Sequence, residues 1–257
     1  MFDLPDKIKN LIGEEKYQLD TVWRSESKVI IFSDKVLKIQ TISQESETER
    51  SIMAWLQNKL PVPKILGYAR DEKRDYLLMT KIPGEMACSP KYLNKPEQLI
   101  SLLAKALRMF WEVDINNCPF NNNLDEKLQR AKYNVKNNLV DVKNAEKDTF
   151  GKNGFKNPEH LLEWLYNNKP KEELVLSHGD FCLPNIFFRN DKITGFIDLA
   201  RAGMADKWQD IALCYRSLLN NLSEKYRSQT FYSLFEKLRI SPERDKIRYY
   251  ILLDDLL

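Results

Sequence analysis

Residues 177–185 read SHGDFCLPN, and residues 193–198 read ITGFID. The two stretches carry three polar side chains, Asp180, Asn185 and Asp198, with apolar sequence around each motif. The runs at residues 174–177, 186–189 and 193–198 are short and rich in β-branched and aromatic residues, which is typical of strands. We therefore expect a carboxylate and a carboxamide on a loop between two strands, and a second carboxylate at the end of a third strand.

These three residue types suit the transfer of a phosphoryl group. An Asp can orient an acceptor hydroxyl and take its proton, and Asn and Asp oxygens are ligands that Mg²⁺ prefers. Phosphoryl transfer depends mainly on positioning and on neutralising phosphate charge. Asn185 follows Asp180 by five residues and Asp198 follows it by eighteen, which is the catalytic-loop and metal-loop pattern of the kinase superfold in its small-molecule form. A lone His-Gly-Asp turn is common by chance, so the joint pattern carries this prediction, and His178 is expected to organise the loop.

The region before residue 82 is rich in strand patterns. Residues 23–40 indicate a hairpin, residues 65–70 and 75–80 indicate two further strands, and a helix is expected to open at a capping box of Ser46 and Glu49 and to end by Pro61. Lys38 lies in an apolar strand eleven residues before Glu49. A strand lysine alone usually faces solvent, but the downstream motif favours a Lys–Glu pair that contacts nucleotide phosphates.

After residue 83 the patterns are mainly helical, beginning with apolar positions at helical spacing in residues 96–113. We predict an α+β, two-lobed, protein-kinase-like fold. Its N-terminal nucleotide-binding lobe, an antiparallel sheet, would span residues 1–82, and its mainly helical catalytic lobe would span residues 83–257. Nucleotide is expected between the lobes, under the strand that carries Lys38.

Composition excludes several other classes of protein. The 257 residues carry a net charge of only +3 without a clustered basic stretch, which argues against nucleic acid or a membrane as a partner. No apolar run approaches the length of a membrane span, and no signal peptide is recognised. The four cysteines are widely spaced, so free thiols and a cytoplasmic location are expected. A monomer is expected, and a dimer stays open.

The chain resembles the bacterial aminoglycoside 3′-phosphotransferases from about residue 10 to its C-terminus. The similarity is strongest in residues 176–180, 185–186, 195–199, 201 and 205–212, and it includes residues 60–64 and the ending at residues 249–254. This combination is far more specific than any single motif. It implies an enzyme that moves the γ-phosphate of ATP to the 3′-hydroxyl of kanamycin- or neomycin-type antibiotics and so confers resistance.

The resemblance also implies roles for individual residues. Asp180 would be the catalytic residue, Asn185 and Asp198 the Mg²⁺ ligands, Lys38 the contact to the α- and β-phosphates, and Glu49 its partner. The segment at residues 79–82, with Thr80 and Ile82, would pair with the adenine edge. Asp210 would support the catalytic loop together with His178, and Arg201 would lie near the active centre. Because residues 23–28 contain no glycine, Ser25 and Ser27 are the candidates for further phosphate contacts.

An aminoglycoside carries several ammonium groups, so its site calls for separate carboxylates. The candidates are Glu146, Asp148, Asp255 and the terminal carboxylate of Leu257. Relatives carry acidic residues where this chain has Asn220 and Asn221, which leaves the range of accepted antibiotics open. Val36 replaces an aromatic residue of some relatives, so GTP stays possible beside ATP. Two other readings stay open: a kinase of choline, a sugar or an amino alcohol, and a nucleotide-binding module without turnover.

Overall fold

The computed structural model describes residues 4–19, 27–152 and 154–257. Contacts within the chain divide it into two compact units. The first unit joins Met1–Met86 to Pro184–Arg201, and the second joins Ala87–Leu183 to Ala202–Leu257. The first unit holds most of the strands and the second most of the helices, so the predicted α+β class is confirmed. Residues 184–201, which begin at the end of the predicted catalytic loop, pack with the N-terminal unit, and a single boundary at residue 82 does not anticipate this.

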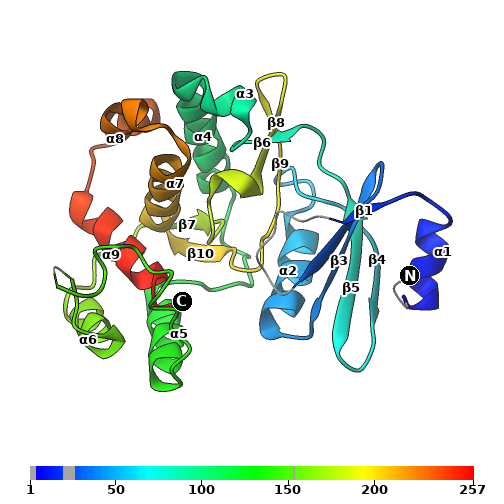
Figure 1. Cartoon of the computed structure of the whole chain (residues 1–257), viewed down its shortest axis with the longest axis horizontal. Coiled ribbons are helices and arrows are strands. Elements are labelled where there is room, and N and C mark those ends of the chain that lie inside the picture. The colour runs from blue at the N-terminus through cyan, green and yellow to red at the C-terminus, as the bar shows by residue number, and fades with distance from the viewer. Residues whose placement is uncertain (1–3, 20–26, 153) are drawn as a thin grey trace. The chain divides into compact units, whose positions relative to one another are not determined.

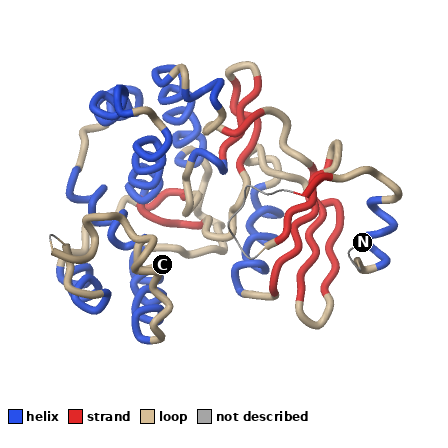
Figure 2. The backbone as a smooth tube through the Cα atoms, in the orientation of Figure 1, coloured by secondary structure: helices blue, strands red, loops and turns tan. Residues whose placement is uncertain are grey.

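The first unit is built on a five-stranded antiparallel sheet with the strand order β1-β2-β3-β5-β4 (Figures 1 and 2). Its elements are α1 (Asp6–Ile12), β1 (Gln18–Leu19), β2 (Lys28–Ile31), β3 (Lys35–Thr41), α2 (Gln44–Leu56), β4 (Ile65–Arg70) and β5 (Arg74–Thr80). The strands predicted at residues 65–70 and 75–80 are present, and so is the hairpin from Lys28 on, while residues 23–26 lie outside the described residues. In register, Lys38 of β3 lies opposite Leu77 of β5.

Alternation along β3 decides which side chains face which helix. Leu37 and Ile39 are buried in a cluster with Ile8 and Ile12 of α1. Successive side chains of a strand point to opposite faces. Lys38 therefore points to the other face of the sheet, where it bonds to Glu49 of α2. The only charged residue of the apolar stretch 36–39 thus belongs to the α2 side of the sheet.

Helix α2 begins earlier than the sequence pattern suggested. Its N-cap is Ser43, and the capping box joins Ser43 to Ser46: each hydroxyl accepts a hydrogen bond from the other residue's backbone N–H at 3.1 Å. The predicted box of Ser46 and Glu49 is therefore wrong. The backbone N–H of Ser46, which would donate to the carboxylate of Glu49 in that box, donates to the Ser43 hydroxyl instead.

A second, three-stranded sheet in the first unit pairs β6 (Glu85–Met86) with β8 (Ile186–Arg189), and β8 with β9 (Lys192–Phe196). Asn190 and Asp191 turn the β8–β9 hairpin with positive φ angles of 50° and 59°, as two-residue hairpin turns require. The expectation that Asp198 ends a strand is wrong, because β9 stops at Phe196. Asp198 lies beyond it with a φ of 58°.

The second unit is mainly helical and contains one two-stranded antiparallel sheet. Its elements are α3 (Pro90–Leu93), α4 (Pro96–Trp111), α5 (Leu124–Lys136), α6 (Pro158–Asn167), β7 (Leu174–Ser177), β10 (Gly203–Asp206), α7 (Lys207–Asn221), α8 (Glu224–Leu238) and α9 (Arg244–Asp254), and the 3₁₀ turn Leu183–Asn185 leads back to the first unit. Buried residues of α4 and α7 form its centre. Strand β10 pairs with β7 and orients the segment that leads into α7.

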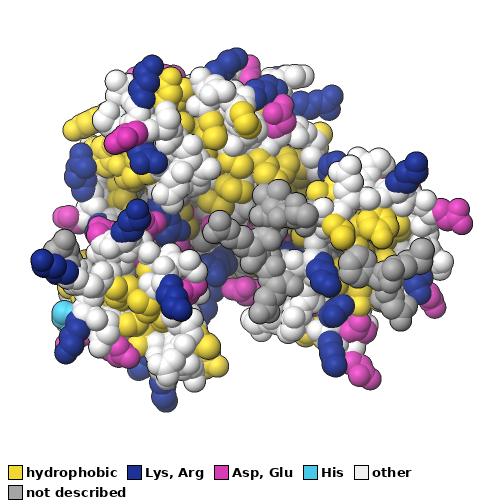
Figure 3. All heavy atoms as spheres, in the orientation of Figure 1, with side chains coloured by type: hydrophobic (Ala, Val, Ile, Leu, Met, Phe, Trp, Pro, Cys, Tyr) yellow, Lys and Arg dark blue, Asp and Glu magenta, His cyan; other side chains and the backbone are white. Residues whose placement is uncertain are grey.

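Other expectations from composition can be compared with the described residues. None of their helices is long and apolar enough to cross a membrane. All four cysteines are free thiols, as predicted. On the face shown in Figure 3, basic and acidic side chains are interspersed.

The link between the end of β5 and the three-stranded sheet depends on Gly84. Its φ is 111°, and a Cβ atom there would lie 2.3 Å from the backbone oxygen of Phe188. We expect Gly84→Ala to lower the free energy of unfolding by at least about 2 kcal/mol, since backbone strain of this kind alone costs about 1–3 kcal/mol. Urea unfolding measures this. Gly151→Ala is the control, because Gly151 has a φ of 95° but open space around it. Equal losses in the two variants would contradict the steric argument.

Candidate functional site

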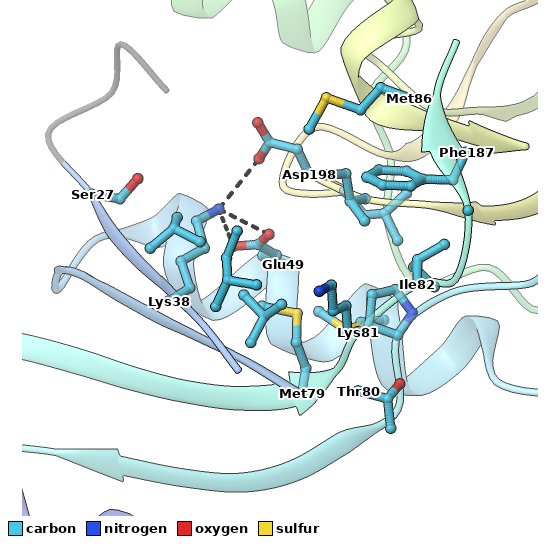
Figure 4. Close-up of a pocket in the computed structure, with 18 residues that line it drawn as sticks. Ser27, Lys38, Glu49, Met79, Thr80, Lys81, Ile82, Met86, Phe187 and Asp198 are labelled. Carbon is cyan, nitrogen blue, oxygen red and sulfur yellow. Dashed lines mark hydrogen bonds and ion pairs between the residues drawn. The ribbon is translucent and has the colours of Figure 1, made fainter. Parts of the chain in front are cut away.

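The first unit contains a pocket with a cavity volume of about 180 Å³, partly open to solvent (Figure 4). Its walls are mostly apolar and come from the sheet, from α2 and from residues 197–199: they include Val29, Val36, Met53, Met79, Phe187 and Leu199. Three ionisable side chains, Lys38, Glu49 and Asp198, gather at one end. An apolar cavity with a few convergent polar groups is the usual form of a small-molecule site.

Lys38 is the central group of this polar end. Its Nζ lies 2.9 Å and 2.8 Å from the two oxygens of Glu49 and 3.3 Å from Oδ1 of Asp198. Gln40, two residues along β3, donates a further hydrogen bond to Glu49 at 3.3 Å. The Glu49 side chain is only 3% exposed, whereas that of Asp198 is 39% exposed. Glu49 is therefore a fixed internal anchor, and Asp198 is the carboxylate with access to solvent.

The charges around Lys38 keep it protonated. Burial acts to lower the pKa of Lys38, but the Glu49 and Asp198 carboxylates outweigh it, and the pKa lies above its ordinary value of 10.5. The pocket therefore holds a permanent positive charge at neutral pH. Such a charge, fixed in position by a buried carboxylate, suits recognition of an anion.

The segments that carry Asn185 and Asp198 are joined by a backbone hydrogen bond in the first unit. The backbone N–H of Ile197 donates to the carbonyl oxygen of Asn185 at 3.0 Å, which holds the two residues on neighbouring segments. The positive φ of Asp198 turns its side chain out of the line of β9 and into the pocket. A carboxamide and a partly exposed carboxylate fit Mg²⁺, which is often bound by one or two protein ligands together with phosphate oxygens and water. In the described residues no group of three or more His, Cys, Asp and Glu could hold a metal ion.

Several of the residues predicted to bind nucleotide line the same pocket. Ser27, Thr80 and Ile82 are among them, together with Lys38 and Glu49. The Thr80 hydroxyl accepts from the backbone N–H of Lys64 at 2.9 Å, which ties the end of β5 to the segment before β4. Ser25 lies outside the described residues.

The segment with Asp180 is organised by α7 within the second unit. The buried carboxylate of Asp210 accepts hydrogen bonds from the Ser177 hydroxyl at 2.9 Å and from the backbone N–H groups of His178 and Gly179 at 2.7 and 3.0 Å. Burial raises the pKa of Asp210 although these donors act to lower it. Gln209 was missed by the sequence analysis, and its side chain donates to the carbonyl oxygen of Gly179 at 3.0 Å.

Both sides of the Gly179 peptide are thus fixed, and Gly179 has a φ of 82°. His178 is fully buried, its ring packs against Phe110 and Phe181, and its Nδ1 accepts from the backbone N–H of Asp180 at 3.3 Å. The side chains of Asp210, Gln209 and His178 therefore determine the backbone at Asp180. The supporting roles of His178 and Asp210 in catalysis stay predictions.

The predicted acceptor-binding carboxylates have partners of their own in the second unit. Asp255, whose side chain is 6% exposed, accepts from the Thr149 hydroxyl at 2.5 Å and from the backbone N–H of Glu146 at 3.4 Å. Arg216 forms ion pairs with Asp254 and, at 3.8 Å, with Glu146. Burial raises the pKa of Asp255. Asp255 thus holds the loop with Glu146 to the end of α9, and Arg216, which the sequence analysis missed, neutralises part of this cluster.

The other three candidates lie as follows. Asp148 is exposed and pairs with Arg248 at 3.2 Å. The backbone N–H of Leu257 donates to the backbone carbonyl oxygen of Asp254 at 3.0 Å, and the backbone oxygen of Leu257 accepts from the Asn134 side chain at 3.4 Å. In the first unit, Nε of Arg201 lies 3.6 Å from Glu45 in the first turn of α2. Their contacts to an antibiotic stay predictions.

The sequence of residues 15–249 matches the model of the phosphotransferase enzyme family, abbreviated APH. The chain belongs to this family. It is 41% identical to an aminoglycoside 3′-phosphotransferase of Enterococcus faecalis over 98% of this chain and 89% of that one. It is also 39% identical to a protein of the same name from Staphylococcus aureus, over 97% of each chain.

Solved structures of aminoglycoside phosphotransferases share the fold. That of APH(3′′)-Id from Streptomyces rimosus, in complex with ADP and streptomycin, has a TM-score of 0.82 and 25% identity, with 100% of this chain and 99% of that chain covered. The crystal structure of an aminoglycoside 3′-phosphotransferase of type VIII has a TM-score of 0.80 over 98% of both chains at 23% identity. The predicted two-lobed kinase-like fold and the predicted family are therefore confirmed.

The charge balance at Lys38 gives a prediction that needs no ligand. We expect Glu49→Gln to lower the pKa of Lys38, because burial already acts in that direction and one of the two opposing carboxylates is lost. In the wild type the raised pKa of Lys38 stabilises the folded state. This contribution is fully present below pH 10.5 and is lost as the pH rises through the higher pKa that Lys38 has in the folded state. NMR titration of ¹³C-labelled lysines measures the shift.

Glu15→Gln is the matched control for this titration. Glu15 pairs at 2.6 Å with Lys35, which lies on the same strand as Lys38, and raises the pKa of Lys35. The control is expected to move the titration of Lys35 and to leave that of Lys38 in place. A Lys38 titration that Glu49→Gln does not shift would show that Glu49 does not control its charge.

Proposed function

We propose that this chain transfers the γ-phosphate of ATP to the 3′-hydroxyl of kanamycin- and neomycin-type aminoglycosides, in the presence of Mg²⁺, and so confers resistance to them. The observation that carries the proposal is the arrangement of Lys38 between Glu49 and Asp198 at the polar end of an apolar pocket. Membership of the phosphotransferase family and the names of the relatives support the same activity.

The nucleotide would occupy the pocket of the first unit. Its base would lie on the apolar walls near Met79 and Ile82, and its α- and β-phosphates would reach Lys38. The ammonium group of Lys38 is already held in place by Glu49, so little reorganisation is needed when phosphates bind. Val36 supplies an aliphatic wall, which does not discriminate between ATP and GTP.

Asn185 and Asp198 would hold Mg²⁺. When bound, the ion supplies positive charge that neutralises phosphate oxygens during the transfer. The residues of the chain contribute by keeping two hard oxygen ligands adjacent: the Ile197 N–H bond to Asn185 fixes one segment to the other. Because Lys38 also contacts Asp198, the lysine and the metal ligand are oriented together.

Asp180 would orient the acceptor hydroxyl and take its proton. Asn185 follows it by five positions, so the backbone limits the distance between their Cα atoms to about 18 Å. The hydrogen bonds from Asp210 and Gln209 fix the preceding Gly179, and a fixed base is what in-line transfer requires. No covalent intermediate with the enzyme is needed.

The acceptor would be held by carboxylates of the second unit. Glu146, Asp148, Asp255 and the terminal carboxylate of Leu257 are the candidates, with Arg201 near the active centre. Among these, Asp255 is occupied by Thr149 and by the Glu146 backbone, so its part would be to place the 146–149 loop. Direct charge attraction to ammonium groups would then come from Glu146 and Asp148, the more exposed members.

We expect purified protein with Mg²⁺ and ATP to show nucleotide turnover that depends on kanamycin or neomycin. Asp180→Asn should reduce this turnover by about 10² to 10⁴, the usual effect of removing a general base. Asp191→Asn is the control, because Asp191 is an exposed carboxylate in the β8–β9 turn. Wild-type protein that binds ATP but is stimulated only by another small alcohol would overturn the aminoglycoside assignment.

The metal assignment is tested by titration. Removal of divalent cations with EDTA should abolish turnover, and Mg²⁺ should restore it. We expect Asp198→Asn to need a higher Mg²⁺ concentration for half-maximal turnover, because a neutral amide is a weaker ligand than a carboxylate. Asp191→Asn should follow the wild-type Mg²⁺ curve. If Asp198→Asn also followed it, Asp198 would not be a ligand.

A further inference from the structure

Polar residues on one face of the main sheet form a docking site for α2. Gln40 of β3 lies directly opposite Asp75 of β5, and Lys38 lies two residues from Gln40 on the same strand. Side chains two apart on a strand, and side chains of directly opposed residues, share a face of the sheet. Lys38, Gln40 and Asp75 therefore point to the same side, which is the side that carries α2.

Helix α2 meets this face at two points. Glu49 bonds to Lys38 and Gln40, as described above. Three residues earlier, the Ser46 hydroxyl donates to Oδ2 of Asp75 at 2.6 Å. Residues three apart on a helix lie on the same side of it. The two contacts thus fix the helix along its axis and against rotation, which a single contact could not do.

Asp75 is well suited to be the second anchor. Its side chain is only 2% exposed, and it also accepts hydrogen bonds from the Tyr68 hydroxyl at 2.5 Å and from Nε of Arg70 at 2.7 Å. Burial acts to raise the pKa of Asp75, but Arg70, Ser46 and Tyr68 outweigh it and hold the pKa at about 2. The group facing Ser46 is therefore an ionised, immobile acceptor at neutral pH.

We propose that Asp75, acting through Ser46, is a positioning residue for nucleotide binding: it fixes α2 so that Glu49 holds Lys38 where the phosphates bind. The inference rests on the proposed function and extends it to a residue that does not line the pocket. Loss of the Ser46 contact leaves Glu49 and Lys38 chemically intact but lets the helix shift, and the lysine then has to be ordered when the nucleotide binds.

The test compares the affinity of the full chain for Mg²⁺–ATP by calorimetry, without any aminoglycoside. Ser46→Ala is expected to weaken binding about three- to tenfold. This loss is smaller than the full contribution of one hydrogen bond to a charged group, because the bond acts on the nucleotide only indirectly. Asp75→Asn keeps the shape of the side chain and removes its charge, and it is expected to weaken binding by a smaller factor than Ser46→Ala does. Urea unfolding of each variant establishes that it is folded at the assay temperature.

Two control variants separate positioning from general stability. Tyr68→Phe removes a hydrogen bond from the other oxygen of Asp75 and leaves the Ser46 contact in place. Ser43→Ala removes the N-cap side chain of α2, which forms the capping box together with Ser46. This variant also leaves the hydrogen bond from Ser46 to Asp75 in place. Both controls are expected to lower stability and to bind Mg²⁺–ATP as the wild type does. Equal weakening in Ser46→Ala and in either control would overturn the inference.

A double-mutant cycle with Lys38→Met supplies the decisive readout. If Asp75 acts through the lysine, Ser46→Ala should add no further loss of affinity in the Lys38→Met background. Additive losses would show that Ser46 affects binding by another route. That outcome would overturn the inference but not the proposed function. Wild-type protein that binds no Mg²⁺–ATP would overturn the proposed function itself, and the inference with it.

Discussion

The buried ion pair of Lys38 and Glu49 is the interaction around which the first unit is arranged. A buried carboxylate or ammonium group is costly unless it is paired and hydrogen-bonded, so each of the two requires the other. Glu49 is satisfied by Lys38 and Gln40 from β3, which forces α2 to lie against one face of the sheet. The opposite face of β3 is then free for the apolar cluster with α1. One ion pair thereby sets the orientation of a strand, a helix and the polar end of a pocket.

The second unit also contains a buried carboxylate that needs hydrogen-bond donors, that of Asp210. Its carboxylate is fully buried, and burial raises its pKa, so the group depends on the donors that surround it. Those donors are the Ser177 hydroxyl and two consecutive backbone N–H groups of the segment before Asp180. A buried acceptor thus determines the conformation of a short segment that has little regular structure. Both units use a buried carboxylate to fix a polar group whose position the proposed chemistry needs.

Sequence reasoning worked best where spacing along the chain was enough. The strands expected at residues 65–70 and 75–80, the pairing of Lys38 with Glu49 and the free cysteines are found as predicted. It was wrong where two local signals competed: Ser46 with Glu49 has the form of a capping box, but the helix begins at Gln44, and the Ser46 backbone N–H donates to the Ser43 hydroxyl. It missed Gln209 and Arg216, because a polar residue in an amphipathic helix gives no sign of which distant backbone or carboxylate it will meet.

The sequence by itself determined the class of fold and the three polar positions of the predicted phosphotransfer motif, because residues on one short loop and on the segment that follows a nearby strand keep a fixed spacing along the chain. Only the tertiary structure decided which carboxylates are exposed and which are hydrogen-bonded inside the protein. Asp198 has access to the pocket, while Asp75 and Asp255 accept hydrogen bonds from residues far away in the sequence. The physical reason is that the burial and partners of a charge depend on contacts between distant segments, and these contacts leave no periodic trace in the sequence.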